Sequence, residues 1–238
     1  MKKKSSRLLR YLKASWIRNG TLIPYKLDNF CRLIALTMSL SLPAIATKSV
    51  GVCLIFGLGF SACSPDLPEP TSDFYSKQGW SQYKNGQYDD AKSSFELAQR
   101  LNQDSAEASL GLGWLAFVES ADLQIAKEQL ENALLLADQD GNQDLLNDAR
   151  AGLAGINLSL ELYQDAIKYG EQIEDGYQFT RGRPNFGYRE LTLLLAISYF
   201  HLGNYDDSVE KIQQLNPKFS WQPDDSPAKI LKELEKRS

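Results

Sequence analysis

His201 is the residue best suited to acid–base chemistry, because it is the single histidine of the chain and Tyr199 lies two positions before it. A general base must lie within hydrogen-bond reach of the proton that it removes. The sequence contains neither an HExxH pair for a metal nor a GxxxxGK[ST] phosphate loop, the motifs that place such chemistry on a fold. We therefore predict a protein that is not an enzyme, with no catalytic residue, no metal and no cofactor. An enzyme working through His201 remains the alternative.

Two pairs of neighbouring acids, Asp89-Asp90 and Asp206-Asp207, could also serve as paired carboxylates. Each pair follows a Gly-x-Tyr sequence and precedes small and apolar residues at helical spacing. The first turn of a helix favours carboxylates, because the helix dipole is positive there. We interpret both pairs as helix-start residues.

Cys63 is a candidate for lipid modification. An uncharged apolar run of eleven residues, 50–60, is followed by Ser61-Ala62-Cys63. Eleven residues are too few to cross a hydrocarbon core of about 30 Å, but they suit the central region of a signal peptide. Small residues directly before a cysteine resemble the bacterial lipobox, in which cleavage before the cysteine leaves it acylated. The alternatives are a short membrane anchor and a secretory signal cut after Ala62.

The leader of 62 residues exceeds the length of a signal peptide, which is about 15–30 residues. A start at Met38 would give a leader of 25 residues, so we predict that residues 1–37 are an extension from a misassigned start. A cytosolic segment is the alternative. Ser64 follows Cys63, and by resemblance to lipoproteins this favours export. The expected location is the cell envelope, lipid-anchored to the outer membrane and facing the periplasm.

Charge divides the chain into two unlike parts. Residues 1–62 carry ten Lys or Arg and one acid, whereas the remainder carries sixteen bases and 29 acids. A strongly acidic body is repelled by phosphate backbones, so we expect no binding to nucleic acid. The three cysteines all lie at or before residue 63, which leaves the body without a disulfide or a cysteine metal site.

An internal repeat organises the acidic body. The pattern of residues 86–95, a glycine, a tyrosine two positions on, two acids and then small and apolar residues, returns at 203–212. This pattern indicates a turn followed by a helix, and its recurrence indicates repeats. Helical periodicity runs from Asp73 to Leu215 without an alternating strand pattern of useful length. We predict an all-α chain.

The spacing of small and aromatic residues in the first unit resembles the tetratricopeptide repeat, with its helix A at about 73–85 and its helix B at about 88–101. Gly79 lets the two helices approach, and Phe95 fills the space between them. The small residue that opens helix B recurs after 35, 40 and 42 residues, against a family period of about 34. The units that follow have the small and apolar residues Gly113, Ala126, Leu130, Ala133; Ala154, Tyr163, Ala166, Gly170, Ile173; and Ala196, Tyr199, Gly203, Tyr205, Ser208, Ile212, Leu215.

The resemblance implies a helical solenoid of about four repeats. The predicted organisation is a leader at 1–62, a lipidated cysteine and Pro-rich tether at 63–72, repeats at 73–217 and a capping helix within 218–238. Ser226-Pro227 is typical of a helix start. A terminal helix is expected because the last repeat would otherwise expose a core face.

In the tetratricopeptide family, the A helices line a concave groove that binds a peptide or a helix of a partner protein. The resemblance therefore implies a scaffold or adaptor, for example in pilus or secretion-channel assembly, outer-membrane protein assembly or the regulation of cell-wall enzymes. Two alternatives remain open: a module that binds cell-wall glycan, peptide or a small ligand, and a groove covered by the long loop, the C-terminal helix or tight packing. The residues carried over to the groove are Trp80, Tyr83, Lys84, Leu110, Trp114, Phe117, Leu193, Ile197, Phe200 and His201.

An insertion between Asp175 and Tyr188 brings three arginines, Arg181, Arg183 and Arg189, close together in sequence. Arginine offers a planar fork suited to carboxylates or phosphates. One interpretation is a basic spot that recognises an acidic partner segment or a lipid headgroup. The other is that the aromatic residues of the insertion fold onto the solenoid while the arginines neutralise neighbouring repeats.

Overall fold

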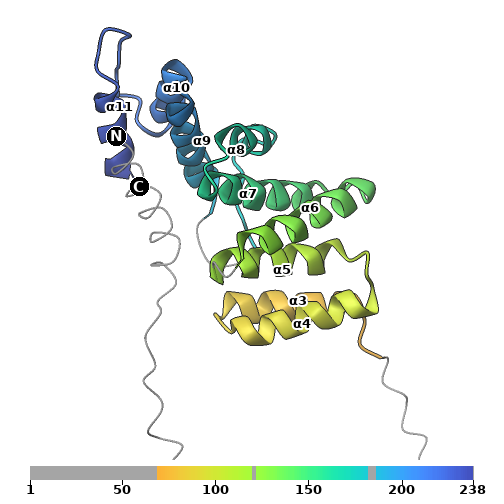
Figure 1. The fold of residues 1–238 in the computed structure, drawn as a ribbon. Helices are drawn as coiled ribbons and strands as arrows, with labels where there is room; N and C mark the ends of the chain where they lie inside the picture. The colour runs from red at the N-terminus through yellow and green to blue at the C-terminus, as the bar shows by residue number, and fades with distance from the viewer. Residues whose placement is uncertain (1–68, 120–121, 182–185, 238) are drawn as a thin grey trace, which may run out of the picture. The chain divides into compact units, whose positions relative to one another are not determined.

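The computed structural model describes residues 69–119, 122–181 and 186–237, so the predictions on Cys63, Arg183 and the leader lie outside the described residues. Within these ranges the chain forms helices joined by connections that are short except before α9 and before α11 (Figure 1). The β pairing of the described residues is an isolated bridge between Gln178 and Gly187. The prediction of an all-α fold is confirmed. The helices are α3 (Ser72–Lys84), α4 (Tyr88–Leu101), α5 (Ala106–Glu119), α6 (Leu123–Gln139), α7 (Gln143–Ser159), α8 (Tyr163–Gly170), α9 (Tyr188–Leu202), α10 (Tyr205–Leu215) and α11 (Ala228–Arg237).

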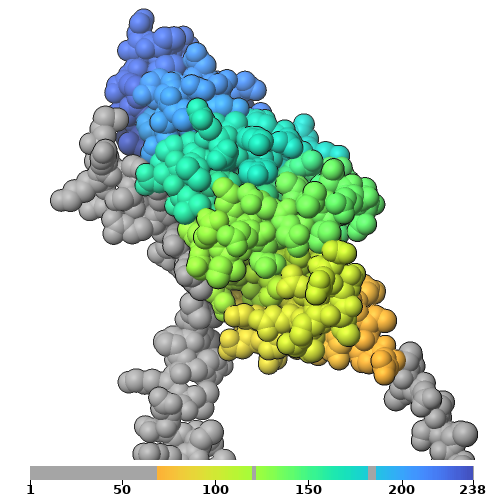
Figure 2. Space-filling model, turned by 45° about the vertical axis from the view of Figure 1, so that its right-hand side comes forward, coloured from red at the N-terminus to blue at the C-terminus, as the bar shows by residue number. Residues whose placement is uncertain are grey.

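The helices pack as a stack of four helix-turn-helix repeats: α3/α4, α5/α6, α7/α8 and α9/α10. Each helix contacts the next, and the first helices of successive repeats also contact one another, α3 with α5, α5 with α7 and α7 with α9. In the space-filling view the repeats follow one another in chain order (Figure 2). Helix α11 contacts α9 and α10 and buries Ile230 and Leu234 completely. It therefore lies where the first helix of a further repeat would be expected.

Glycine in a left-handed conformation ends the first helix of the outer repeats. Gly86 and Gly203 have φ angles of 78° and 82°, which residues with a Cβ adopt at a cost. The second helices then begin at Tyr88 and Tyr205. Both acid pairs lie in the first turns of these helices, as the sequence predicted, at Asp89, Asp90, Asp206 and Asp207.

One buried side chain joins the first repeat to the second. Phe95 of α4 has no exposed surface, and its ring fills the space left by two glycines, Gly79 of α3 and Gly111 of α5. A Cβ added at Gly79 would lie 2.7 Å from the ring, and one added at Gly111 would lie 2.4 Å from it. The ring therefore sets the separation of three helices.

Leu130 of the second repeat also fills a space left by two glycines of neighbouring helices. It is completely buried in α6, and a Cβ at Gly113 or Gly152 would lie 2.6 Å or 2.5 Å from its side chain. The second repeat lacks an aromatic residue at this position, and leucine takes its place.

The third repeat differs from its expected pattern. Ile173 was expected on its second helix, but α8 ends at Gly170 after eight residues. A Cβ at Gly170 would lie 2.8 Å from Leu195 of α9, so the next repeat approaches closely at this point. Ile173 is still buried, but it belongs to the connection that follows the helix.

Candidate functional site

The residues expected to line an open groove are mostly buried. Eight of the ten have at most 9% of their surface exposed: Trp80, Tyr83, Leu110, Trp114, Phe117, Leu193, Ile197 and Phe200. His201 is half-buried and Lys84 is exposed. These eight side chains therefore pack into the core of the solenoid and do not line an open groove, which agrees with the alternative of a covered groove.

Part of this burial comes from the connection between α8 and α9. We call residues 177–181 of this connection the strap. Phe179 of the strap lies against two of the expected groove residues, with its ring centroid 4.5 Å from Trp114 and 6.1 Å from Trp80. Phe186, on the far side of the connection, lies 5.9 Å from Trp114. The alternative of a groove covered by the long loop is thus observed around both tryptophans.

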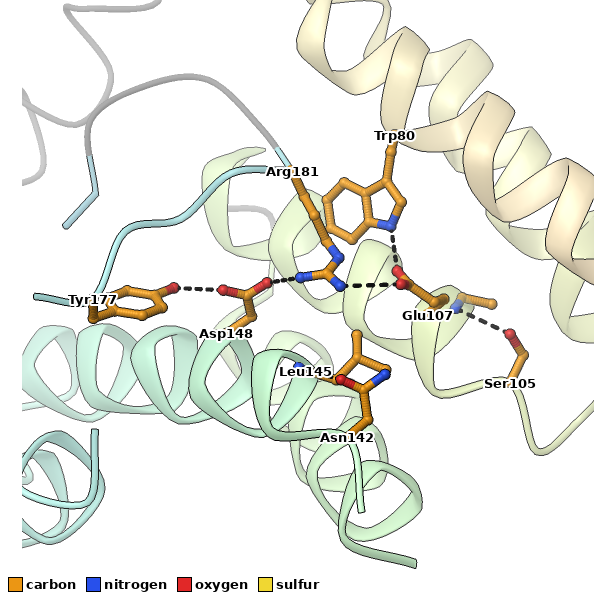
Figure 3. Close-up of polar contacts among 9 residues, drawn as sticks. Trp80, Ser105, Glu107, Asn142, Leu145, Asp148, Tyr177 and Arg181 are labelled. Carbon is orange, nitrogen blue, oxygen red and sulfur yellow. Dashed lines mark hydrogen bonds and ion pairs between the residues drawn. The ribbon is translucent and has the colours of Figure 1, made fainter. Parts of the chain in front are cut away.

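A chain of polar contacts continues from the aromatic cluster across three repeats (Figure 3). The indole Nε1 of Trp80 donates to Oε2 of Glu107 at 2.7 Å, and Nη2 of Arg181 lies 3.2 Å from Oε1 of the same carboxylate. Nη1 of Arg181 pairs with Oδ2 of Asp148. The hydroxyl of Tyr177 donates to Oδ1 of Asp148 at 2.8 Å. We call these five residues the arginine clamp.

The first helices of three repeats position the clamp. Trp80 lies on α3, Glu107 on α5 and Asp148 on α7, whereas Tyr177 and Arg181 belong to the strap. The two helices that carry the acids have capped starts. The Ser105 hydroxyl accepts from the backbone N–H of Ala108 at 3.3 Å, and the Asn142 side chain accepts from that of Leu145 at 3.2 Å. Such caps stabilise the helix starts from which both acids project (Figure 3).

Comparison with known families agrees with this architecture. The sequence model of a family described as "Tetratricopeptide repeat" matches residues 76–121. This part of the chain is a tetratricopeptide repeat region. The matched range includes most of α3 together with α4 and α5, and thus contains Phe95 and both of the glycines that it packs against. No curated protein matches the chain.

Burial and the neighbouring charges together set the pKa values of the clamp residues. The Asp148 side chain is 4% exposed. Burial raises the pKa of this carboxyl to about 6, although Arg181 and the Tyr177 hydroxyl both act to lower it. Burial also acts to lower the pKa of the Arg181 guanidinium, but the charges of Glu107 and Asp148 outweigh it and hold that pKa above its usual value. Burial, with the neighbouring Asp148, raises the pKa of Tyr177. Above pH 6 one guanidinium thus faces two carboxylates.

The predicted basic spot does not form at Arg181. Its guanidinium is paired with Glu107 and Asp148, so its charge is compensated by two repeats rather than offered to a ligand. Arg189 is on α9, and 65% of its side chain is exposed. Its Nη1 lies 3.9 Å from Oε1 of the neighbouring Glu190. Arg181 and Arg189 therefore have unlike environments. The contacts of Arg181 fit the interpretation that the arginines of the insertion neutralise acids of neighbouring repeats.

His201 and Tyr199 have separate contacts. The imidazole stacks on the ring of Tyr163 with centroids 4.5 Å apart, and burial lowers its pKa, opposed by the charge of Glu161. The Tyr199 hydroxyl donates to Oε1 of Glu171 at 3.0 Å. The residues from 69 onward that the structure describes contain no group of three or more His, Cys, Asp or Glu side chains placed to hold a metal. Within those residues no helix is long and apolar enough to span a membrane.

The sequence reasoning missed Glu107 and Asp148. One signal was present for Asp148, because it interrupts a stretch of α7 in which nearly every residue is buried. A buried acid needs a partner, and the insertion supplied an arginine among aromatic residues. That reasoning indicates that Asp148 needs a partner, but it does not say which residue the partner is.

Proposed function

We propose that this tetratricopeptide repeat protein is a non-catalytic scaffold of the bacterial cell envelope, which docks a partner protein on the first helices of its repeats. The observation that carries the proposal is the strap. The first helices of three repeats already hold a segment of about five residues through aromatic packing and an arginine–carboxylate pair. Solenoids bind partner segments by the same kind of contact.

The composition of this face supports a role in binding. Interfaces draw most of their binding energy from a few buried residues, and tryptophan, tyrosine and arginine are enriched among them. Here Trp80 and Trp114 meet Phe179, while Arg181 meets two acids. No comparable observation supports a glycan module, because the aromatic faces that would stack on a sugar are buried against other side chains.

The envelope part of the proposal is supported by the sequence. The apolar run before Ser61-Ala62-Cys63 and the Pro-rich segment after it fit a lipoprotein signal and a tether. We propose that acylated Cys63 anchors the chain to the outer membrane, with the repeats in the periplasm. Such a scaffold would suit any of three roles: assembly of a pilus or secretion channel, assembly of outer-membrane proteins, or control of cell-wall enzymes.

Mass spectrometry of the mature N-terminus tests the anchor. We expect an N-terminal acylated Cys63, and we expect Cys63→Ser to move the protein from the membrane fraction to the soluble periplasmic fraction. An unmodified N-terminal residue other than Cys63 contradicts the anchor.

Site-directed photo-crosslinking in cells tests the docking face. Thr180 is an exposed residue of the strap, and Lys232 is an exposed residue of α11, away from the clamp in sequence. A photo-reactive residue at Thr180 is expected to crosslink a specific protein that the same residue at Lys232 does not capture. Equal capture at both positions, or none at either, contradicts docking on this face.

A further inference from the structure

The strap occupies the solenoid surface as an extended ligand would. Its side chains alternate in exposure: Tyr177 and Phe179 are buried and Arg181 is mostly buried, whereas Gln178 and Thr180 are exposed. An extended backbone presents alternate side chains to one face. Tyr177 and Arg181 contact the clamp acids (Figure 3), and Phe179 contacts the tryptophans. The site therefore accommodates an aromatic residue followed two positions later by arginine, which in the strap are Phe179 and Arg181.

We propose that this site binds an extended segment of a partner protein with the pattern aromatic–any–Arg, which replaces Phe179 and Arg181 of the chain's own strap. The inference rests on the proposed scaffold function, and it names the chemistry of the partner. The strap is then a built-in competitor that occupies the site until such a segment arrives.

Charge decides which segments can replace the strap. Without Arg181, the site would hold two carboxylates with no cation, and Asp148 is almost completely buried. Leaving a buried charge unpaired is costly, so a replacement segment must bring a cation. Arginine can pair with both carboxylates at once through its planar fork, whereas lysine offers a single ammonium group.

Aromatic packing decides the second position. The Phe179 ring lies within 6.1 Å of both tryptophan rings, and it is itself almost completely buried. The indole of Trp80 also donates to Glu107, which orients the carboxylate that meets Arg181. The aromatic and basic positions are thus linked through Trp80, and a segment that lacks either is expected to bind poorly.

Competition by the strap determines how binding must be measured. A tethered segment acts at an effective concentration on the order of millimolar, and the apparent affinity of a free ligand falls by the fraction of molecules whose site is open. The wild-type chain is therefore expected to bind a free peptide weakly. Removing the anchors of the strap opens the site.

The probe is the peptide acetyl-Tyr-Gln-Phe-Thr-Arg-amide with a fluorescent label, titrated into the purified full chain and followed by anisotropy. We expect the Phe179→Ala/Arg181→Ala variant to bind it at least tenfold more tightly than the wild type does. Replacing Phe by Ala or Arg by Lys in the peptide is expected to weaken binding at least tenfold. Arg189→Ala, which removes an exposed arginine near the same connection, is the matched control and should behave as the wild type.

Adding Asp148→Asn to the double variant is expected to remove the preference for Arg over Lys in the peptide. A double variant that keeps its circular dichroism spectrum but does not bind the peptide, or binds the Ala peptide equally, overturns the inference. If the double variant does not fold, Arg181→Gln alone must show the same order of affinities.

Two further outcomes separate this inference from the function on which it rests. A partner captured at Thr180 whose binding is insensitive to the peptide overturns the inference and leaves the scaffold function standing. A dimer of the wild-type chain that exchanges straps, seen by light scattering and lost in the double variant, identifies a second copy as the occupant and also overturns it.

Discussion

Adding one methyl group at Gly111 tests whether the Phe95 ring sets the spacing of the first two repeats. A Cβ there would lie 2.4 Å from Cε1 and Cζ of Phe95. The ring has little room to move toward α3, because it already fills the space where Gly79 lacks a Cβ, 2.7 Å from that position. Overpacking of this kind costs about 1–3 kcal/mol, whereas alanine is better than glycine in a helix by about 1 kcal/mol. We expect Gly111→Ala to lower the free energy of unfolding by about 0–2 kcal/mol.

A double-mutant cycle isolates the clash. Phe95→Val removes Cδ1, Cε1 and Cζ, the three ring atoms that the new methyl group would meet. By itself it should cost about 2–4 kcal/mol, somewhat less than a Phe-to-Ala change in a core. In that background Gly111→Ala fills space and favours the helix, so it is expected to stabilise the chain by about 1 kcal/mol. The coupling between the two changes is then about 1–3 kcal/mol.

Urea unfolding of the full chain, followed by far-UV circular dichroism, measures all four corners of the cycle. The comparison requires equal denaturant slopes, because a changed slope indicates that the repeats no longer unfold together. Effects that add to within about 0.5 kcal/mol would refute the reasoning, since independent sites behave in that way.

Three further predictions concern the clamp and the second repeat. Arg181→Ala leaves two carboxylates unpaired and is expected to cost about 2–4 kcal/mol of unfolding free energy, whereas Arg189→Ala should change it by at most about 0.5 kcal/mol; equal losses in urea unfolding contradict the clamp. The folded-state pKa of Asp148, about 6, lies above its unfolded value, so its contribution to stability is present at low pH and is lost as the pH rises through 6. Unfolding measured from pH 4 to 7 should therefore favour Asp148→Asn over the wild type increasingly, by about 3 kcal/mol in total, and a constant difference contradicts the assignment. Leu130→Ala should cost about 2–5 kcal/mol in a melt by circular dichroism, and a loss below about 1 kcal/mol contradicts its role between two glycines.

The repeats could be predicted because their signals are local. A glycine that ends one helix and acids that start the next lie within a few residues of one another, so the first two helices, expected at about 73–85 and 88–101, are observed at Ser72–Lys84 and Tyr88–Leu101. The small residues that let helices approach are equally local. The family spacing then arranges the helices without further information.

The clamp could not be predicted in the same way. Arg181 lies 33 residues from Asp148 and 74 residues from Glu107 in sequence, and no local pattern shows which carboxylate an inserted arginine will meet. The groove residues failed for the same reason. Their positions on the first helices were inferred from the family, but the exposure of Trp80 and Trp114 depends on where an insertion outside the repeat pattern folds.

The strap changes how the solenoid holds together as a whole. In a simple repeat array each unit touches only its neighbours, so the ends can fray without consequence for units further along. Here Phe179, inserted after the third repeat, packs on Trp80 of the first. That contact closes a loop of nearly one hundred residues and makes the unfolding of the first repeat depend on the third. The first three repeats should therefore melt as one cooperative block.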